Sequence, residues 1–143
     1  MHFNKMDLGH WQLKDGLQFS SDAFGFIYEI VCVPLNKKYI GKKQRISRVK
    51  RKPLKGKTRN RIDHKESDWK TYTGSSKELN EDILKYGKEN FTFTILEWGG
   101  SKWELGYKEI KHQLEHDVIL NENFYNGILN VRIGRPPKSF TND

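Results

Sequence analysis

Residues 24–41 read FGFIYEIVCVPLNKKYIG. Residues 24–33 are rich in β-branched and aromatic side chains, which is typical of a buried strand. Residues 34–38 indicate a turn, and Tyr39-Ile-Gly41 begins a second, short strand. This stretch therefore predicts a β-hairpin, and the rest of the fold can be built around it.

Downstream of the hairpin the sequence predicts a helix and a third strand. Ser75 or Ser76 can cap a helix over residues 77–86, because Ser75 and Glu78 have capping-box spacing and Gly87 supplies a stop. Residues 91–98 (FTFTILEW) alternate well enough for a strand, which Gly99-Gly100 ends.

A second helix is expected after the glycine pair. Ser101 and Glu104 form another capping box, and residues 121–123 end the helix. Large apolar residues recur at spacings of 4, 3, 4 and 4 and predict a buried stripe: Trp103, Tyr107, Ile110, Leu114 and Val118. A last short strand is expected near residues 128–133.

The order of elements predicts an α+β domain with a small three-stranded antiparallel sheet flanked by helices. With 143 residues the chain has room for one domain. We expect a polar N-terminal extension over residues 1–23, the domain over 24–133 with a basic insertion at 42–62, and a loose basic tail over 134–143.

The positive charge is concentrated in the insertion. The chain has 26 Lys and Arg against 18 Asp and Glu, a net charge of +8. Residues 42–62 hold no acid and eleven of the bases: Lys42, Lys43, Arg45, Arg48, Lys50, Arg51, Lys52, Lys55, Lys57, Arg59 and Arg61. The segment predicts a loop or mobile arm with a short helical turn around residues 46–49. A solvated charged loop is one interpretation, and an arm that neutralises phosphates is the favoured one.

Other classes of protein are excluded by composition. Cys32 is the single cysteine, so no disulfide scaffold can form within the chain. No stretch approaches the roughly 20 apolar residues of a membrane span. The first residues lack the apolar core of a signal peptide, which predicts an intracellular, cytoplasmic protein.

The hairpin also resembles a known nuclease signature. Phe26-Ile-Tyr28, ten intervening residues and Tyr39-Ile-Gly41 are similar to the two-part motif of GIY-YIG nucleases, although Gly25 stands one residue further upstream than in Gly-Ile-Tyr. Residues 84–91 with 95–97 resemble the helix-to-strand passage of the family's homing endonucleases. Tyr125-Asn126 resembles the family's closing Tyr-Asn, and small phage homing-type members are the nearest in character.

The resemblance implies a DNA endonuclease that hydrolyses phosphodiester bonds with Mg²⁺ or Mn²⁺. It implies that Glu109 holds the metal, that Tyr28 and Tyr39 orient or deprotonate the attacking water, and that Asn126 supports the site. A tyrosine pKa near ~10 would need nearby cations for a role as base. The alternatives are core aromatics, a turn asparagine and a solvated helix glutamate, with Glu115 as a second candidate ligand.

The family's phosphate-clamping arginine is obscured by the insertion. Counting back from Ser75 places it at Arg61, and counting forward from Tyr39 favours Arg48; Arg61 is preferred. If that stretch is helical, His64 or Lys65 lies one turn further on. The double-stranded DNA partner is expected to contact Lys42, Lys43, Arg45, Arg48, Lys50, Arg51, Lys55, Lys57, Arg59 and, in the tail, Arg135.

Three further expectations complete the interpretation. Gly134-Arg-Pro-Pro-Lys138 resembles the core of an AT-hook, which would add a minor-groove contact, and a homodimer could supply specificity. His112, Glu115 and His116 match the H-x-x-E-H pattern of inverted zinc peptidases, but only 27 residues follow in which to find a third ligand. A catalytically silent DNA-binding module of the same fold is the main alternative.

Overall fold

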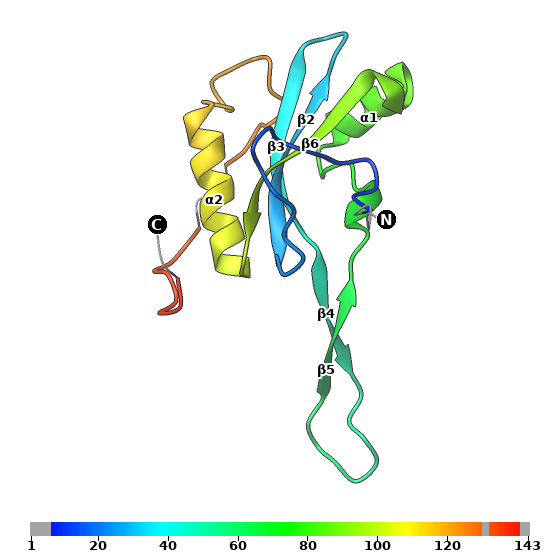
Figure 1. Ribbon diagram of the computed structural model, residues 1–143, viewed down its shortest axis with the longest axis vertical. Coiled ribbons are helices and arrows are strands. Elements are labelled where there is room, and N and C mark those ends of the chain that lie inside the picture. The colour runs from blue at the N-terminus through cyan, green and yellow to red at the C-terminus, as the bar shows by residue number, and fades with distance from the viewer. Residues whose placement is uncertain (1–6, 130–131, 141–143) are drawn as a thin grey trace, which may run out of the picture.

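The computed structural model describes residues 7–129 and 132–140. A four-stranded sheet with the strand order β1-β6-β2-β3 forms the body (Figure 1). Its strands are β1 (Gln12–Leu13), β2 (Gly25–Cys32), β3 (Lys37–Gln44) and β6 (Phe91–Gly99). The helices are α1 (Lys77–Tyr86) and α2 (Lys102–Glu115), with short 3₁₀ turns η1 (Trp69–Thr71) and η2 (Lys88–Asn90). A separate pair, β4 (Ile46–Arg51) and β5 (Arg61–Glu66), makes a second sheet.

The predicted hairpin and fold class are confirmed. Strand β2 lies at the centre and pairs antiparallel with both β3 and β6. The fold is α+β, with a mainly antiparallel sheet and two helices. One strand was not expected: Gln12 and Leu13 pair parallel with Thr94 and Ile95 of β6. This edge strand comes from the segment interpreted as an extension, and it is held there because the Trp11 side chain is buried and donates to the carbonyl of Trp69.

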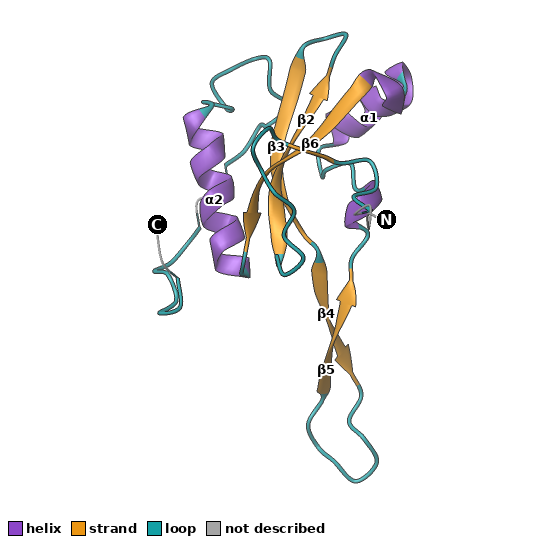
Figure 2. Cartoon of the chain, in the orientation of Figure 1, coloured by secondary structure: helices purple, strands orange, loops and turns teal. Residues whose placement is uncertain are grey.

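Alternation along β2 creates a core on each face of the sheet, between the two helices (Figure 2). Phe26, Tyr28 and Ile30 point toward α1 into a large aromatic cluster. Ile27 points toward α2, where it joins Ile40 of β3 in a smaller cluster. Fully burying each such side chain contributes about 1.5–3 kcal/mol.

Both helices begin at a serine, as expected, but the buried face of α2 differs from the predicted stripe. The Ser76 side chain accepts from the Leu79 N–H, and that of Ser101 accepts from the Glu104 N–H. Within α2 the buried residues are Leu105 and Gln113, whereas Leu114 is 55% exposed. The stripe prediction is wrong at Leu114, because the face that packs on the sheet runs through Leu105 and Gln113. The expected helix end at residues 121–123 is also wrong: α2 ends at Glu115, and Val118 is buried beyond it.

The basic segment is a β-ribbon, so the prediction of a loop with a helical turn is wrong. Strands β4 and β5 pair antiparallel from Ile46 opposite Glu66 to Arg51 opposite Arg61. The ribbon projects away from the body (Figure 1). A tight turn at its tip is closed by Lys57 N–H donating to the Leu54 carbonyl, with Gly56 at φ 83°. β-branched Ile46, Val49 and Ile62 favour the extended conformation despite the surrounding charge.

The C-terminal tail is docked on α2 rather than loose over its described part. The Trp103 indole donates to the Gly134 carbonyl at 2.9 Å, and the Phe140 ring lies 4.8 Å from the Trp103 ring. Of the last predicted strand, residues 130–131 lie outside the described residues, and 128–129 and 132–133 form no strand. Among the described residues, no helix has the length and apolar character to cross a membrane.

Candidate active site

A pocket of about 430 Å³ lies at the outer edge of β3. Its walls come from β3, the start of α1, the middle of α2 and the chain that follows α2. The lining residues are Tyr39, Lys42, Ser75, Ser76, Glu109, Gln113, Tyr125, Asn126, Gly127 and Ile128. Three of the sequence-predicted catalytic residues are therefore brought together here: Tyr39, Glu109 and Asn126.

The edge of β3 is covered by the segment that carries Asn126. Lys38 N–H donates to the Asn123 carbonyl, and Tyr125 N–H donates to the Lys38 carbonyl, as in a short parallel bridge. Beyond it, the Asn126 side chain binds the backbone N–H and carbonyl of Ile40. Gln113 of α2 donates to the same carbonyl at 3.0 Å. The edge strand is thus fixed by two amide side chains at the position of the pocket.

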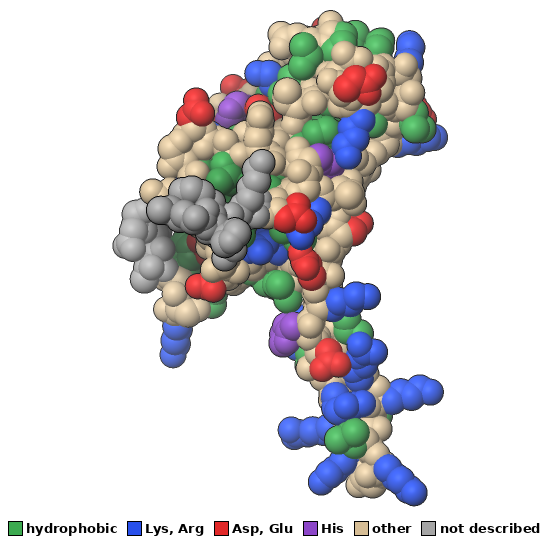
Figure 3. Space-filling model, turned by 45° about the vertical axis from the view of Figure 1, so that its right-hand side comes forward, with side chains coloured by type: hydrophobic (Ala, Val, Ile, Leu, Met, Phe, Trp, Pro, Cys, Tyr) green, Lys and Arg blue, Asp and Glu red, His purple; other side chains and the backbone are tan. Residues whose placement is uncertain are grey.

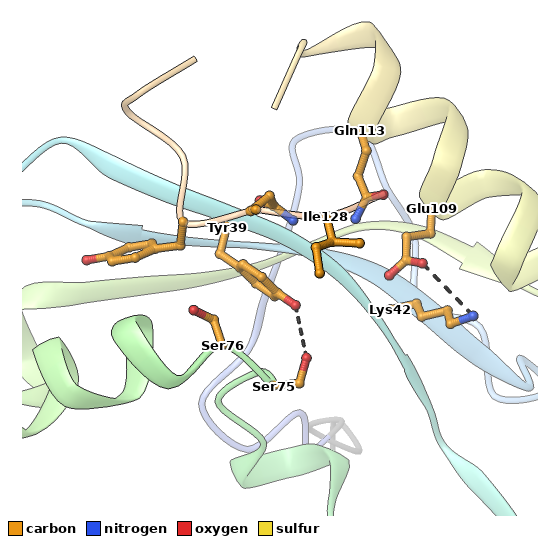
Figure 4. Close-up of a pocket in the computed structure, with 10 residues that line it drawn as sticks. Tyr39, Lys42, Ser75, Ser76, Glu109, Gln113 and Ile128 are labelled. Carbon is orange, nitrogen blue, oxygen red and sulfur yellow. Dashed lines mark hydrogen bonds and ion pairs between the residues drawn. The ribbon is translucent and has the colours of Figure 1, made fainter. Parts of the chain in front are cut away.

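Tyr39 and Glu109 reach the pocket from opposite sides of β3 (Figure 4). The Tyr39 hydroxyl lies 3.1 Å from the Ser75 hydroxyl at the start of α1. The Glu109 carboxylate comes from α2 and lies 4.0 Å from the ammonium of Lys42. The pocket therefore combines a phenol, a carboxylate and an ammonium group around one space.

Tyr28 does not line the pocket but lies in the core next to Tyr39. Its side chain is 1% exposed, and its ring lies 6.1 Å from the rings of both Tyr39 and Tyr72. A Cβ on Gly41 would come within 2.5 Å of the Tyr28 hydroxyl, so the glycine of Tyr-Ile-Gly leaves room for that hydroxyl. Burial raises the pKa of both Tyr28 and Tyr39 above the usual tyrosine value.

Those pKa directions limit the chemistry of the tyrosines. A sequence-based role as base required nearby cations to lower a tyrosine pKa, and here burial has the opposite effect on Tyr39. The Tyr39 hydroxyl is therefore protonated at neutral pH. A neutral phenol can donate to and accept from a water molecule, which suits a positioning role.

Glu109 has the chemistry of a site for a hard divalent cation. Burial raises the pKa of its carboxyl, opposed by the charge and the backbone N–H of Lys42. Buried Oε1 of Gln113, one helical turn away, has no hydrogen-bond partner among the described residues. Mg²⁺ prefers oxygen ligands and keeps several waters, so one carboxylate beside an unsatisfied amide oxygen fits it. No group of three or more His, Cys, Asp or Glu side chains suited to a metal occurs in the described chain.

Arg61 is not brought to the pocket. It begins β5, and its guanidinium donates to the Lys52 carbonyl across the base of the tip loop. Arg48, the other candidate, lies on β4 of the same ribbon. The helical placement of Arg61, His64 and Lys65 is wrong, because residues 61–66 form a strand.

Two residues predicted to bind DNA are held within the fold. The Arg45 guanidinium lies over the rings of Trp69 and Trp98 and donates to the Ser20 carbonyl. Lys43 forms an ion pair with Asp68 at 2.7 Å. Arg45 and Lys43 therefore stabilise the fold where the ribbon leaves β3.

Sequence reasoning missed the positions of several pocket residues. Lys42 was expected to bind nucleic acid, but nothing distinguished it from its ten basic neighbours; its place two residues before the end of β3 does so. The sequence predicted Ser75 only as a helix cap. Gln113 occupied one of the unspecified positions of the H-x-x-E-H pattern and was given no role. Tyr72, which contacts Tyr28 but does not line the pocket, carried no signal, because its approach to Tyr28 depends on the tertiary fold.

The histidines of the H-x-x-E-H pattern have other partners. The His112 Nε2 lies 2.7 Å from a Glu97 carboxylate oxygen on β6, and the His116 Nδ1 lies 2.8 Å from the His112 carbonyl. Glu115 is exposed and does not line the pocket. This geometry favours a salt-bridged helix face over a zinc centre.

The family of the chain follows from a sequence comparison. A family model described as "Putative endonuclease segE, GIY-YIG domain" matches residues 11–129. No curated protein and no solved structure gives a match. The matched range includes β1, the whole sheet, the ribbon and the pocket. The chain therefore belongs to the SegE family of GIY-YIG endonuclease domains.

Proposed function

We propose that the protein is a metal-dependent DNA endonuclease that hydrolyses phosphodiester bonds at the β3-edge pocket. The observation that carries this proposal is the convergence of Tyr39, Lys42 and Glu109 on one open cavity. Hydrolysis needs an oriented water, a divalent cation and positive charge near the phosphate. Each of these requirements has a candidate among the three side chains.

The roles follow from chemistry and position. Glu109 holds Mg²⁺ or Mn²⁺, which when bound supplies charge stabilisation at the phosphate. Tyr39 orients the water that attacks phosphorus, with its hydroxyl set by Ser75. Lys42 neutralises a phosphate oxygen. Water adds to phosphorus as the bond to the leaving oxygen breaks, and the leaving oxygen takes up a proton, so the products are a phosphate monoester and a free hydroxyl.

Supporting residues keep the reacting groups in place. Asn126 fixes the backbone of β3 through Ile40, and Tyr28 packs beneath the strand. Arg61 lies on the ribbon, so we propose for it a contact with the DNA backbone instead of a clamp on the scissile phosphate. Arg135 in the tail would provide a further backbone contact, because it is exposed.

The resemblance to phage homing-type nucleases extends this proposal to a homing-type role within a phage-infected host cell. A second copy of the chain would double the contacts with DNA, since a domain of this size offers a limited interface on its own. Both points concern biological setting rather than the chemistry of the pocket.

The test is nicking of supercoiled plasmid with Mg²⁺ or Mn²⁺, with and without EDTA. The wild-type protein should cut only with metal, and Glu109→Gln should lose cutting while it still binds plasmid. Glu115→Gln is the matched control, because this exposed carboxylate lies on the same helix outside the pocket. Binding by the wild type without cutting under any divalent metal would instead identify a catalytically silent module.

A further inference from the structure

We propose that the β4–β5 ribbon is a groove-reading arm, which places one of its faces in the major groove of duplex DNA against the base edges. This inference rests on the proposed function, because it concerns how the DNA is held. We define the reading face as Arg48, Lys50, Asn60 and Ile62.

The shape of the ribbon suits a groove. Among the described residues, β4 and β5 pair only with each other, and every residue of β5 is exposed. The major groove is about 12 Å wide and admits a two-stranded β-ribbon. An isolated ribbon is marginally stable in water, so a partner that covers it would also stabilise it.

The strand register sorts the side chains onto two faces. Directly paired residues of an antiparallel ladder point the same way. Arg48 therefore shares a face with His64, and Lys50 shares it with Ile62. Asn60, just before β5, joins Arg48, Lys50 and Ile62 around a shallow cavity of about 350 Å³. The opposite face carries the pairs Val49–Asp63 and Arg51–Arg61.

The two faces carry similar net charge but differ in ion pairing: Arg51, Arg61, Asp63 and Lys65 share the opposite face, and Arg48 and Lys50 share the reading face. On the opposite face Arg51 forms an ion pair with Asp63 at 2.9 Å. On the reading face neither Arg48 nor Lys50 forms an ion pair with any described residue. Lys and Arg side chains stand out from the ribbon on several sides, down to its tip (Figure 3). The reading face is thus a cationic surface without internal compensation, and its complement is a polyanion.

The residue types on this face go beyond what phosphate binding requires. Arg and Lys donate to guanine O6 and N7, Asn pairs with adenine N6 and N7, and an aliphatic side chain contacts the thymine methyl. Ile62 is 51% exposed on this face, where its aliphatic side chain is available to contact a thymine methyl group. Lys55 and Lys57, at the tip turn, are instead suited to phosphates.

The ribbon also fixes where the contacted bases lie. Strand β3 carries Tyr39 and leads into β4 with a single residue, Arg45, between them. From Tyr39 to Arg48 the chain can span at most about 30 Å. At about 3.4 Å per base pair this backbone span corresponds to about 9 base pairs, so with the reach of the two side chains the bases that Arg48 contacts lie roughly within one to one and a half turns of duplex from the cleaved phosphate, on one side of it.

The inference is tested by binding in EDTA, without cleavage. Selection from a pool of duplexes with a randomised centre should yield a preferred sequence. Methylation of guanine N7 in that sequence, which faces the major groove, should block binding, and methylation of adenine N3 in the minor groove should not. Lys50→Ala, Asn60→Ala and Ile62→Ala should each reduce the preference for the selected over a scrambled duplex about 5- to 150-fold.

Lys55→Ala and Lys57→Ala are the matched controls at the tip. Each should weaken binding to all duplexes equally and reduce the salt slope by about 1. A double-stranded RNA of the same length should compete poorly, because its major groove is too narrow for a ribbon. Thermal melts of all variants should match the wild type, since the mutated side chains are exposed.

Any of four results would overturn the groove-reading role: no selected sequence, interference from adenine N3 in place of guanine N7, reading-face variants that behave like the tip controls, or equal competition by the RNA duplex. These failures differ from failure of the proposed function, which is judged by metal-dependent plasmid nicking. An arm that binds only phosphates would leave nicking intact, whereas a groove-reading protein without nuclease activity would pass every binding test.

Discussion

Asn126 satisfies both outward-facing backbone groups of Ile40 with one side chain. Its Oδ1 accepts from the Ile40 N–H at 3.0 Å, and its Nδ2 donates to the Ile40 carbonyl at 2.8 Å. Ile40 lies between Tyr39, which faces the α1 side of the sheet, and Gly41, which leaves room for Tyr28. The turn after α2 thereby holds the strand on which the pocket depends.

Asn126→Ala should therefore destabilise the protein. The buried Ile40 N–H would lose its partner, while the Ile40 carbonyl would keep Gln113 as a donor, which we expect to cost about 1–3 kcal/mol. Urea denaturation should show a lower midpoint with an unchanged slope. Asn123→Ala is the control, because Asn123 contributes its backbone rather than its side chain to the β3 edge. Equal midpoints for the two variants would contradict a structural role for the Asn126 amide.

Glu109→Gln should separate function from stability. Burial raises the pKa of Glu109, so the ionised carboxylate is disfavoured in the folded state. The resulting loss of stability is present at pH values above the raised pKa of Glu109 in the folded protein. It disappears below the pKa of the unfolded chain, because Glu109 is then protonated in both the folded and the unfolded state. At pH 8 the variant should therefore have a higher Tm than the wild type. At pH 4 the gain should vanish.

Calorimetry at the two pH values checks this prediction. Glu115→Gln is the matched control, because its carboxylate is exposed and should change Tm at neither pH. A Glu109→Gln variant that melts below the wild type at pH 8 would mean that the carboxylate stabilises the fold, against the direction of its pKa. Loss of plasmid nicking together with a higher Tm would identify a residue kept for function at a cost in stability.

Tyr39→Phe should reduce plasmid nicking about 10²-fold, as expected for loss of a positioning group, while it leaves the fold intact. The phenyl ring keeps its packing, and the lost hydroxyl interacts with Ser75 at the pocket surface. Because burial raises the Tyr39 pKa, the wild-type rate should show no inflection near pH 7 from this group. Steady-state nicking measured from pH 6 to 9 tests both points, and an unchanged rate for the variant would remove Tyr39 from the mechanism.

The hairpin and both helices could be predicted because their signals are local. Residues 24–33 form a largely apolar run with Glu29 as its one charged residue, and each helix has a serine at its N-terminus. Strand β1 could not be predicted, because two residues carry no periodicity and its place depends on the burial of Trp11.

The ribbon and the pocket needed the tertiary structure for different reasons. In residues 46–51 three cations obscure the β-branched Ile46 and Val49, so the charge suggested a loop where the backbone forms a ladder. In the pocket, Tyr39 and Glu109 meet only because α2 packs across the sheet beside β3. The family resemblance predicted both Tyr39 and Glu109 as site residues. Lys42 could not be distinguished from the other cations of residues 42–62 until the structure placed it on β3 beside the pocket.

His10 should make the fold sensitive to mild acid. Its ring stacks on Phe93 with centroids 3.9 Å apart, and burial, followed by the charge of Lys88, lowers its pKa to about 4 from an ordinary 6.5. Below pH 6.5 the unfolded chain takes up a proton on this side chain that the folded protein does not, so stability falls as pH drops from 6.5 toward 4. The slope contributed by His10 should stay under about 1.4 kcal/mol per pH unit, which is the limit for the uptake of one proton.

His10→Phe should remove this slope, since a phenyl ring can stack on Phe93 and does not titrate. Urea midpoints of the wild type and the variant should converge or cross near neutral pH and diverge toward pH 4, with the variant the more resistant to acid. Carboxylates such as Asp68, whose pKa is lowered by Lys43, titrate in both proteins, so the difference between the two curves isolates His10. His64→Ala, which removes an exposed histidine from the ribbon, should follow the wild-type curve. If His10→Phe loses stability in acid as steeply as the wild type, the proton is taken up elsewhere and His10 does not control the acid response.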